Sequence, residues 1–146
     1  MLRSFSVRSD KEKMDNATSK RNTKQKAAIE RVVLSSCDHP SAETVCERVR
    51  KELPSVSLGT VYRVLKALAL EGRIREISLP NAPSRFDKTT DIHAHFVCLG
   101  CGSVTDVNAE ESEFLSRTRS ALPDWRIEEA DIVFKGLCPN CKEIKL

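Results

Sequence analysis

The sequence predicts an α+β protein with two small parts, a helical N-terminal half followed by a smaller α/β half. Three observations predict this class. Apolar residues recur at helical spacing within residues 24–68, the alternation typical of strands begins at about residue 74, and two C-x-x-C pairs frame the last third of the chain. The 146 residues suffice for one average domain or two very small ones, and we expect two.

Three helices are expected in the N-terminal half. Each begins after a hydroxyl residue suited to the N-cap: Thr23 before residues 24–34, Ser41 before residues 42–52, and Ser57 before residues 58–68. His39-Pro40 separates the first two helices, and Leu53-Pro54 ends the second. The apolar residues expected to face the core are Ala28, Ile29, Val32, Val33, Val45, Val49, Val61, Leu65 and Leu68.

A hairpin follows the third helix, with alternating residues at 74–79, a turn at 80–84, and Arg85-Phe86. Helix, short turn, helix and hairpin is the order of a winged helix-turn-helix, which places its last helix in the major groove of duplex DNA. The candidate DNA contacts are Thr60, Tyr62, Arg63 and Lys66 on the last helix, and Lys20, Arg21, Lys24 and Lys26 around the start of the first. The alternative assigns Tyr62 in part to the core and the lysines to solvent.

Charge is segregated along the chain. Residues 1–89 hold 18 Lys and Arg against 11 Asp and Glu, a net of +7, whereas residues 90–146 hold 6 against 10, a net of −4; together they give the overall +3. The basic half favours a polyanion as partner, and double-stranded DNA fits the helix order. No apolar run reaches the length of a membrane span, and the first 24 residues lack the apolar core of a signal peptide, so we expect a cytoplasmic protein.

The two cysteine pairs are Cys98-Leu-Gly-Cys101 and Cys138-Pro-Asn-Cys141. Four thiolates in two such pairs can close a tetrahedral shell around Zn²⁺, and closed shells of this kind are structural. In a reducing compartment disulfides are disfavoured, so we favour zinc over a disulfide or redox role. Cys37 and Cys46 lie in the helical half and are expected to be buried small hydrophobic residues.

The C-terminal half is expected to hold strands at 93–97, 103–107 and 125–134, with a helix at 109–122 whose apolar residues include Phe114 and Leu115. His93 and His95 are two apart, so a strand projects them to one face, whereas Cys98 has the opposite parity. One strand can therefore supply ligands to two different sites. His39, at a helix start, and Asp87, between the halves, are compatible with a nitrogen and oxygen site that includes both histidines.

Four segments resemble the ferric uptake regulator family. Residues 57–65 (SLGTVYRVL) are similar to its recognition helix and residues 38–42 (DHPSA) to its inter-helix turn. Residues 93–102 (HAHFVCLGCG) are similar to its metal-binding strand, and residues 134–141 (FKGLCPNC) to its closing cysteine pair. The likeness runs from about residue 18 to the C-terminus. It implies a homodimeric, metal-responsive repressor, not an enzyme, that binds a palindromic operator.

Within that family the pattern resembles the peroxide stress regulator branch. The resemblance implies a regulatory Fe²⁺ or Mn²⁺ site formed by His39, Asp87, His93, His95 and Asp106, and oxidation of His39 or His93 when iron meets hydrogen peroxide. It implies an N-terminal extension at 1–18, a winged-helix domain at 19–86, a hinge at 87–92 and a dimerisation domain with the zinc site at 93–146. Two alternatives remain open: an iron- or zinc-uptake regulator of the same family, and, more remotely, a non-haem iron enzyme.

Overall fold

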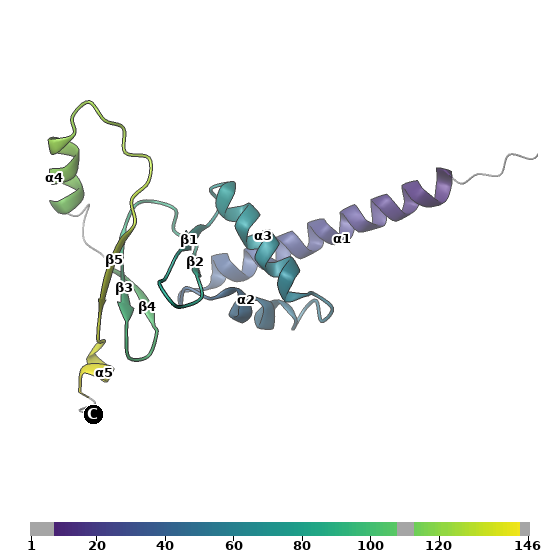
Figure 1. Ribbon diagram of the computed structural model, residues 1–146. Helices are drawn as coiled ribbons and strands as arrows, with labels where there is room; N and C mark the ends of the chain where they lie inside the picture. Colours follow the sequence, from purple (N-terminus) through teal and green to yellow (C-terminus); the bar gives the residue numbers. More distant parts are fainter. Residues whose placement is uncertain (1–7, 108–112, 144–146) are drawn as a thin grey trace, which may run out of the picture.

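The computed structural model describes residues 8–107 and 113–143. The N-terminal half contains α1 (Arg8–Ser35), α2 (Ala42–Val49), α3 (Leu58–Leu70), β1 (Arg75–Ile77) and β2 (Arg85–Asp87). The C-terminal half contains β3 (Ala94–Cys98), β4 (Val104–Val107), α4 (Glu113–Ala121), β5 (Ile132–Gly136) and α5 (Pro139–Lys142). The two halves lie side by side (Figure 1), and the predicted α+β class with a winged helix-turn-helix order is confirmed.

Helix α1 is much longer than expected and extends away from the rest of the molecule (Figure 1). The Thr23 hydroxyl donates to the Ser19 carbonyl at 3.0 Å inside the helix, so the prediction of Thr23 as an N-cap is wrong. Residues 8–22 contain no proline or glycine, the residues that most often end a helix, and a hydroxyl residue can bond back to the carbonyl four residues earlier.

Within the described residues no helix has an apolar stretch able to cross a bilayer.

The two other predicted caps are confirmed. The Ser41 hydroxyl accepts from the Thr44 amide at 3.3 Å, and the Ser57 hydroxyl accepts from the Thr60 amide at 3.1 Å. α2 and α3 pack with the last part of α1 around a core that buries every predicted position except Val32, which is half-buried. Helix α2 ends at Val49, three residues before the expected boundary, and α3 continues to Leu70.

The wing consists of β1 and β2, paired antiparallel with Arg75 opposite Asp87. Phe86, only 1% exposed, lies in the core of the N-terminal half, and its amide donates to the Pro40 carbonyl at 3.0 Å. This bond holds the wing against the loop between α1 and α2. It therefore brings Asp87, the next residue, close to His39 in that loop.

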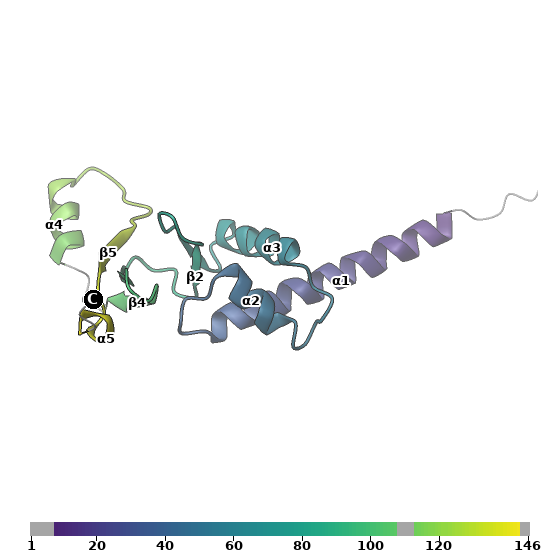
Figure 2. The same cartoon turned by 60° about the horizontal axis from the view of Figure 1, so that its bottom comes forward.

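The C-terminal sheet has the strand order β4-β3-β5, with β4 antiparallel and β5 parallel to β3 (Figure 1). Figure 2 shows β4 and β5 at the end of the molecule away from the start of α1. Strand β5 begins at Ile132, opposite Ala94, so residues 125–131 are not paired as expected. Helix α4 is described from Glu113 and buries Leu115, while residues 109–112 of the expected helix lie outside the described part of the chain. Helix α5, which the sequence did not predict, begins at Pro139 with Cys138 as N-cap.

The halves meet through an apolar cluster. Ile77 of the wing, 2% exposed, packs with Val97 of β3 and Val104 of β4, and the partly buried Leu79 and Val133 flank them. The wing therefore contacts both the helical core and the C-terminal sheet.

The two cysteines outside the C-x-x-C pairs differ. Cys46 is buried in α2 as predicted, whereas Cys37 is exposed, so the prediction for Cys37 is wrong. Cys37 lies just beyond the end of α1, in the loop to α2, where the helical spacing that suggested burial no longer applies. The Lys88 ammonium donates to its sulfur at 3.1 Å.

Candidate metal centres

The four cysteines of the C-x-x-C pairs form one cluster. Cys98 ends β3 and Cys101 lies in the turn after it, while Cys138 and Cys141 come from the start of α5. Their sulfurs all lie within 4.8 Å of one another, with Cys101 Sγ and Cys138 Sγ 3.9 Å apart. The Leu99 amide donates to the Gly136 carbonyl at 2.7 Å, so the sheet pairing of β3 with β5 brings the two pairs together.

The surroundings of these sulfurs favour a bound cation. Amide donation from Cys138 and Cys101 lowers the pKa of Cys98 to about 6, whereas hydrogen bonding with Cys138 and Cys98 raises the pKa of Cys141 to about 12. All four groups cannot ionise side by side unless a positive charge neutralises them. A tetrahedral soft-ligand ion such as Zn²⁺ supplies that charge, so the donor set fits zinc.

A second cluster lies where the two halves meet. His39 comes from the loop before α2 and Asp87 from the end of β2, while His93 immediately precedes β3, His95 lies in β3 and Asp106 in β4. One ligand atom of each lies within 4.8 Å of all the others. The five predicted regulatory residues, far apart in the sequence, are thus assembled by the fold.

The three imidazoles converge on the two carboxylates through their Nε2 atoms. From Asp87 Oδ2, the distances are 2.9 Å to His93, 3.0 Å to His95 and 3.5 Å to His39. From Asp106 Oδ1, they are 2.8 Å to His39, 3.1 Å to His93 and 3.4 Å to His95. Asp106 is 40% exposed while Asp87 is 4% exposed, so the cluster opens toward solvent on the Asp106 side.

Contacts behind the ligands fix their orientation. The backbone carbonyl of Asp91 can only accept, so His93 Nδ1 donates to it at 2.8 Å and leaves Nε2 as the ligand atom. Asp87 accepts from the Thr89 amide through Oδ1 at 2.9 Å, which directs Oδ2 to the histidines. Such contacts hold metal ligands in the correct tautomer and direction.

The charges of this cluster are coupled to one another. Burial raises the pKa of Asp87, but hydrogen bonds from His39 and His95 outweigh it and hold that pKa well below its usual range. The hydrogen bond to Asp87 raises the pKa of His39 despite its burial. His93 donates through Nδ1, so its Nε2 faces the two carboxylates, and a divalent cation could be bound by all three groups at once. The imidazole and carboxylate donor set fits Fe²⁺, Mn²⁺ or Zn²⁺.

A cavity of about 110 Å³ borders this cluster. It is lined by His39, Asp87 and Asp106 together with Ser36, Cys37, Phe86 and Lys88. The buried Nδ1 of His39 has no hydrogen-bond partner among the described residues, and a space of this size accommodates water. The cavity therefore places room for a small solute beside three of the five clustered residues.

The candidate DNA-contacting side chains lie on the surface. Tyr62, Arg63 and Lys66 are exposed on α3 and Thr60 is half-buried, while Lys20, Arg21 and Lys24 are exposed on α1 and Lys26 is partly covered. Tyr62 donates to Glu43 at 2.7 Å, and Lys66 contacts both oxygens of Glu76 at 2.6 Å. The exposed Arg63 forms no hydrogen bond or ion pair with the described residues, so its guanidinium remains available to a ligand.

The sequence did not predict that the Thr89 amide and the Asp91 carbonyl contact the clustered residues. Every residue type has a backbone carbonyl, and all but proline have an amide N–H, so residue type does not reveal such contacts. Sequence reasoning also missed Arg75, a wing residue that contacts the C-terminal half. Its one sequence signal was the alternation of residues 74–79, which predicts a strand but not the partner of its side chain.

Comparisons with known proteins agree with this geometry. The model of the ferric uptake regulator family matches residues 17–135. The peroxide-responsive repressor PerR of Staphylococcus epidermidis is 28% identical over 123 residues, which cover 84% of this chain and 82% of that protein.

Two solved structures share the fold, each with a TM-score of 0.73. The ferric uptake regulator of Helicobacter pylori, described as having three functional metal-binding sites, is 23% identical with full coverage of both chains. The Campylobacter jejuni peroxide stress regulator is 24% identical over 88% of this chain and 97% of its own.

Proposed function

Because the chain belongs to the ferric uptake regulator family of metal-responsive regulators, we propose that it is a homodimeric repressor of transcription. The repressor binds operator DNA when its regulatory site holds Fe²⁺ or Mn²⁺, and it releases the DNA on exposure to hydrogen peroxide. The observation that carries this proposal is the five-residue cluster, whose ligands come from both halves of the chain. The family consists of transcription regulators, so we propose no enzymatic turnover.

The regulatory ligands connect domain arrangement to metal occupancy. His39 and Asp87 belong to the N-terminal half, and His95 and Asp106 to the C-terminal sheet. An ion bound by all of them favours the arrangement in which the halves are close, and its differential affinity sets how far that equilibrium moves. Typical effectors change partner affinity by about 5- to 150-fold, and we expect a change of this order in operator affinity.

We propose that α3 occupies the major groove. Arg63, which forms no hydrogen bond or ion pair with the described residues, is the foremost candidate to read a base, and Thr60, Tyr62 and Lys66 flank it on the same helix. The exposed Lys20, Arg21 and Lys24 of α1 are suited to phosphate contacts. The net charge of +7 on residues 1–89, from 18 basic and 11 acidic residues, supports a polyanion as partner.

The dimer is proposed to form through the C-terminal half. Strand β5 is an edge of the three-stranded sheet, and an edge with unpaired backbone groups is a ready surface for pairing. Large apolar side chains are exposed in this half, and they are Leu99, Phe114, Trp125, Phe134 and Leu137. A second copy of the chain would cover such residues, and Zn²⁺ held by Cys98, Cys101, Cys138 and Cys141 would fix the strand ends that carry them.

Peroxide sensing is proposed from the resemblance of the site and the similarity to PerR. An Fe²⁺ ion held by these residues would supply the redox chemistry that activates peroxide, and the two electrons that reduce the peroxide would come overall from the imidazole ring. The overall change inserts one oxygen atom from H₂O₂ into a ring C–H of His39 or His93 and releases water. Ring oxidation removes an imidazole donor, and His39 is the ligand contributed by the loop between α1 and α2. Its loss would leave Asp87 as the ligand from the N-terminal half and so weaken the connection of that half to the site.

The test begins with anaerobic purification and metal analysis. An operator is selected from random duplex DNA with the Mn²⁺ form, and affinity is then measured with Fe²⁺, Mn²⁺ or Zn²⁺ restored. Stoichiometric peroxide should abolish binding by the Fe²⁺ form only, with one added oxygen mapped to His39 or His93 by peptide mass spectrometry. Loss of binding through cysteine oxidation, or an unaffected Fe²⁺ form, would contradict peroxide sensing.

The same experiment separates an iron- or zinc-uptake regulator from a peroxide sensor. The donor set favours the zinc-uptake regulator as the second candidate. By the general affinity order of divalent metals, a shell of imidazoles and carboxylates binds Zn²⁺ more tightly than Fe²⁺. A zinc-uptake regulator would bind the operator with Zn²⁺ at this site and remain bound in peroxide.

A further inference from the structure

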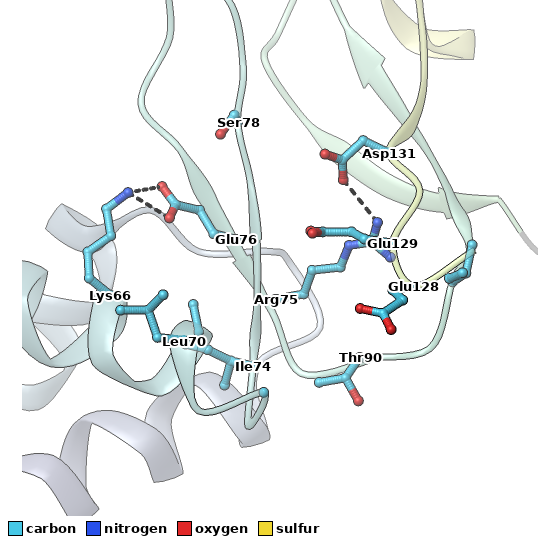
Figure 3. A pocket seen from close by; sticks show the side chains of 13 residues that line it. Lys66, Leu70, Ile74, Arg75, Glu76, Ser78, Thr90, Glu128, Glu129 and Asp131 are labelled. Carbon is cyan, nitrogen blue, oxygen red and sulfur yellow. Dashed lines mark hydrogen bonds and ion pairs between the residues drawn. The ribbon is translucent and has the colours of Figure 1, made fainter. Parts of the chain in front are cut away.

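Arg75 of β1 extends from the wing to the C-terminal half and is only 9% exposed (Figure 3). Its Nη2 donates to Asp131 Oδ1 at 2.9 Å and to the carbonyl of Ala130, just before β5. Its Nη1 points to the carbonyl of Asp91 in the hinge at 3.4 Å. A single side chain thus joins the wing, the hinge and the strand that follows residue 131.

Arg75 is connected through the backbone to two of the regulatory ligands, Asp87 and His93. It is paired across the wing with Asp87, so its backbone position is tied to that of the buried carboxylate. The Asp91 carbonyl that faces Arg75 also accepts from His93 Nδ1 at 2.8 Å. A displacement of Asp91 would therefore rotate the His93 ring, whose Nε2 lies 2.9 Å from Asp87 Oδ2.

The surroundings of Arg75 favour a guanidinium at this position. It borders a cavity of about 890 Å³ whose lining includes the carboxylates of Glu128, Glu129 and Asp131. The other cation in the lining, Lys66, is engaged by Glu76 at 2.6 Å (Figure 3). Arg75 is thus the cation that faces the acidic segment, and a planar guanidinium can reach acceptors in two directions where an ammonium is a point charge.

We propose that Arg75 is a positioning residue for the regulatory metal site. It holds Asp91 and the residues just before β5 against β1, which pairs with the strand that ends at Asp87, so that His93 and Asp87 are oriented before an ion binds. It touches neither the ligand atoms nor the exposed face of α3. Any effect of Arg75 on operator affinity rests on the proposed function, whereas its effect on metal binding can be measured without DNA.

The test uses Arg75→Gln in the full-length chain with zinc retained. Titration with Mn²⁺ should give a regulatory-site affinity about 10- to 100-fold lower than wild type, the usual cost of losing an outer contact of a metal ligand. In the metal-free dimer, amide hydrogen exchange in residues 88–93 should become faster. Asp131→Asn, at a carboxylate that is 66% exposed, should shift both quantities in the same direction by less.

The matched control is Arg73→Gln, two residues earlier, because Arg73 pairs with Glu30 inside the N-terminal half at 2.5 Å. Wild-type Mn²⁺ affinity and hinge exchange in Arg75→Gln would overturn the proposal, as would equal losses in Arg73→Gln. If Arg75→Gln does not fold, Arg75→Lys carries the same test with an intermediate loss.

Operator binding separates this proposal from the proposed function. Arg75→Gln should reduce the gain in operator affinity that Mn²⁺ produces and leave the affinity of the metal-free protein unchanged. If the wild-type chain shows no such gain, the proposed function fails, and the Mn²⁺ titration still decides the role of Arg75.

Discussion

Gly100→Ala should weaken zinc binding through one contact. A Cβ at this position would lie 2.9 Å from both Cβ and Sγ of Cys141. Carbon atoms prefer separations of about 3.5 to 4.0 Å, so the two chain segments must move apart by about 0.6 to 1.1 Å. Metal sites hold their ligand distances to about 0.2 Å, and Cys141 cannot keep its place in a tetrahedral shell after such a shift. The glycines with positive φ are Gly72 and Gly102, so backbone strain does not contribute at Gly100.

The cost of overpacking, about 1 to 3 kcal/mol, corresponds to a zinc affinity about 5- to 150-fold lower. The assay is competition with a chromogenic chelator, combined with thermal unfolding followed by circular dichroism. Gly59→Ala is the matched control, because a Cβ there meets no atom within 4 Å and alanine suits its helix. Wild-type zinc affinity in Gly100→Ala would refute the reasoning, since the close approach of the cysteine pairs would then not constrain the site.

Three further predictions follow from the two centres and the DNA-binding helix. Cys98→Ser should lose bound zinc and stable dimers, measured by metal analysis and light scattering; an intact dimer with an unchanged melting temperature would remove the zinc assignment. Arg63→Ala should lose about 1 to 3 kcal/mol of operator discrimination while both metals stay bound, with Arg31→Ala on α1 as control. With the regulatory metal removed, unfolding free energy should be highest between about pH 4 and pH 6.5, measured by urea unfolding. The depressed pKa of Asp87 gives stability that is lost as pH falls below this window. The raised pKa of His39 gives stability that is lost as pH rises above the window, through the pKa of His39 in the folded state. An Asp87→Asn variant with the same profile would contradict this last prediction.

Local features of the sequence determined the helices near the core, the wing and the two sets of candidate ligands. Ser41 and Ser57 were identifiable because a hydroxyl before an apolar helical pattern satisfies free amides, a rule that operates over three residues. The cysteine pairs were identifiable because C-x-x-C spacing itself sets two sulfurs on one turn. Thr23 failed because the same residue type is tolerated inside a helix, and only the absence of a stop signal upstream extends α1 to Arg8.

Tertiary structure alone decided where β5 begins, how the halves meet and what lies behind the ligands. Residues 125–131 alternate like a strand but remain unpaired, because β3 offers no partner before Ala94. Arg75 resembles any charged residue of a surface hairpin, yet it is buried against Asp91 and Asp131. Residue type and spacing record the interactions of a segment with itself. The partner of a side chain across 56 residues of sequence is fixed only when the whole chain has packed.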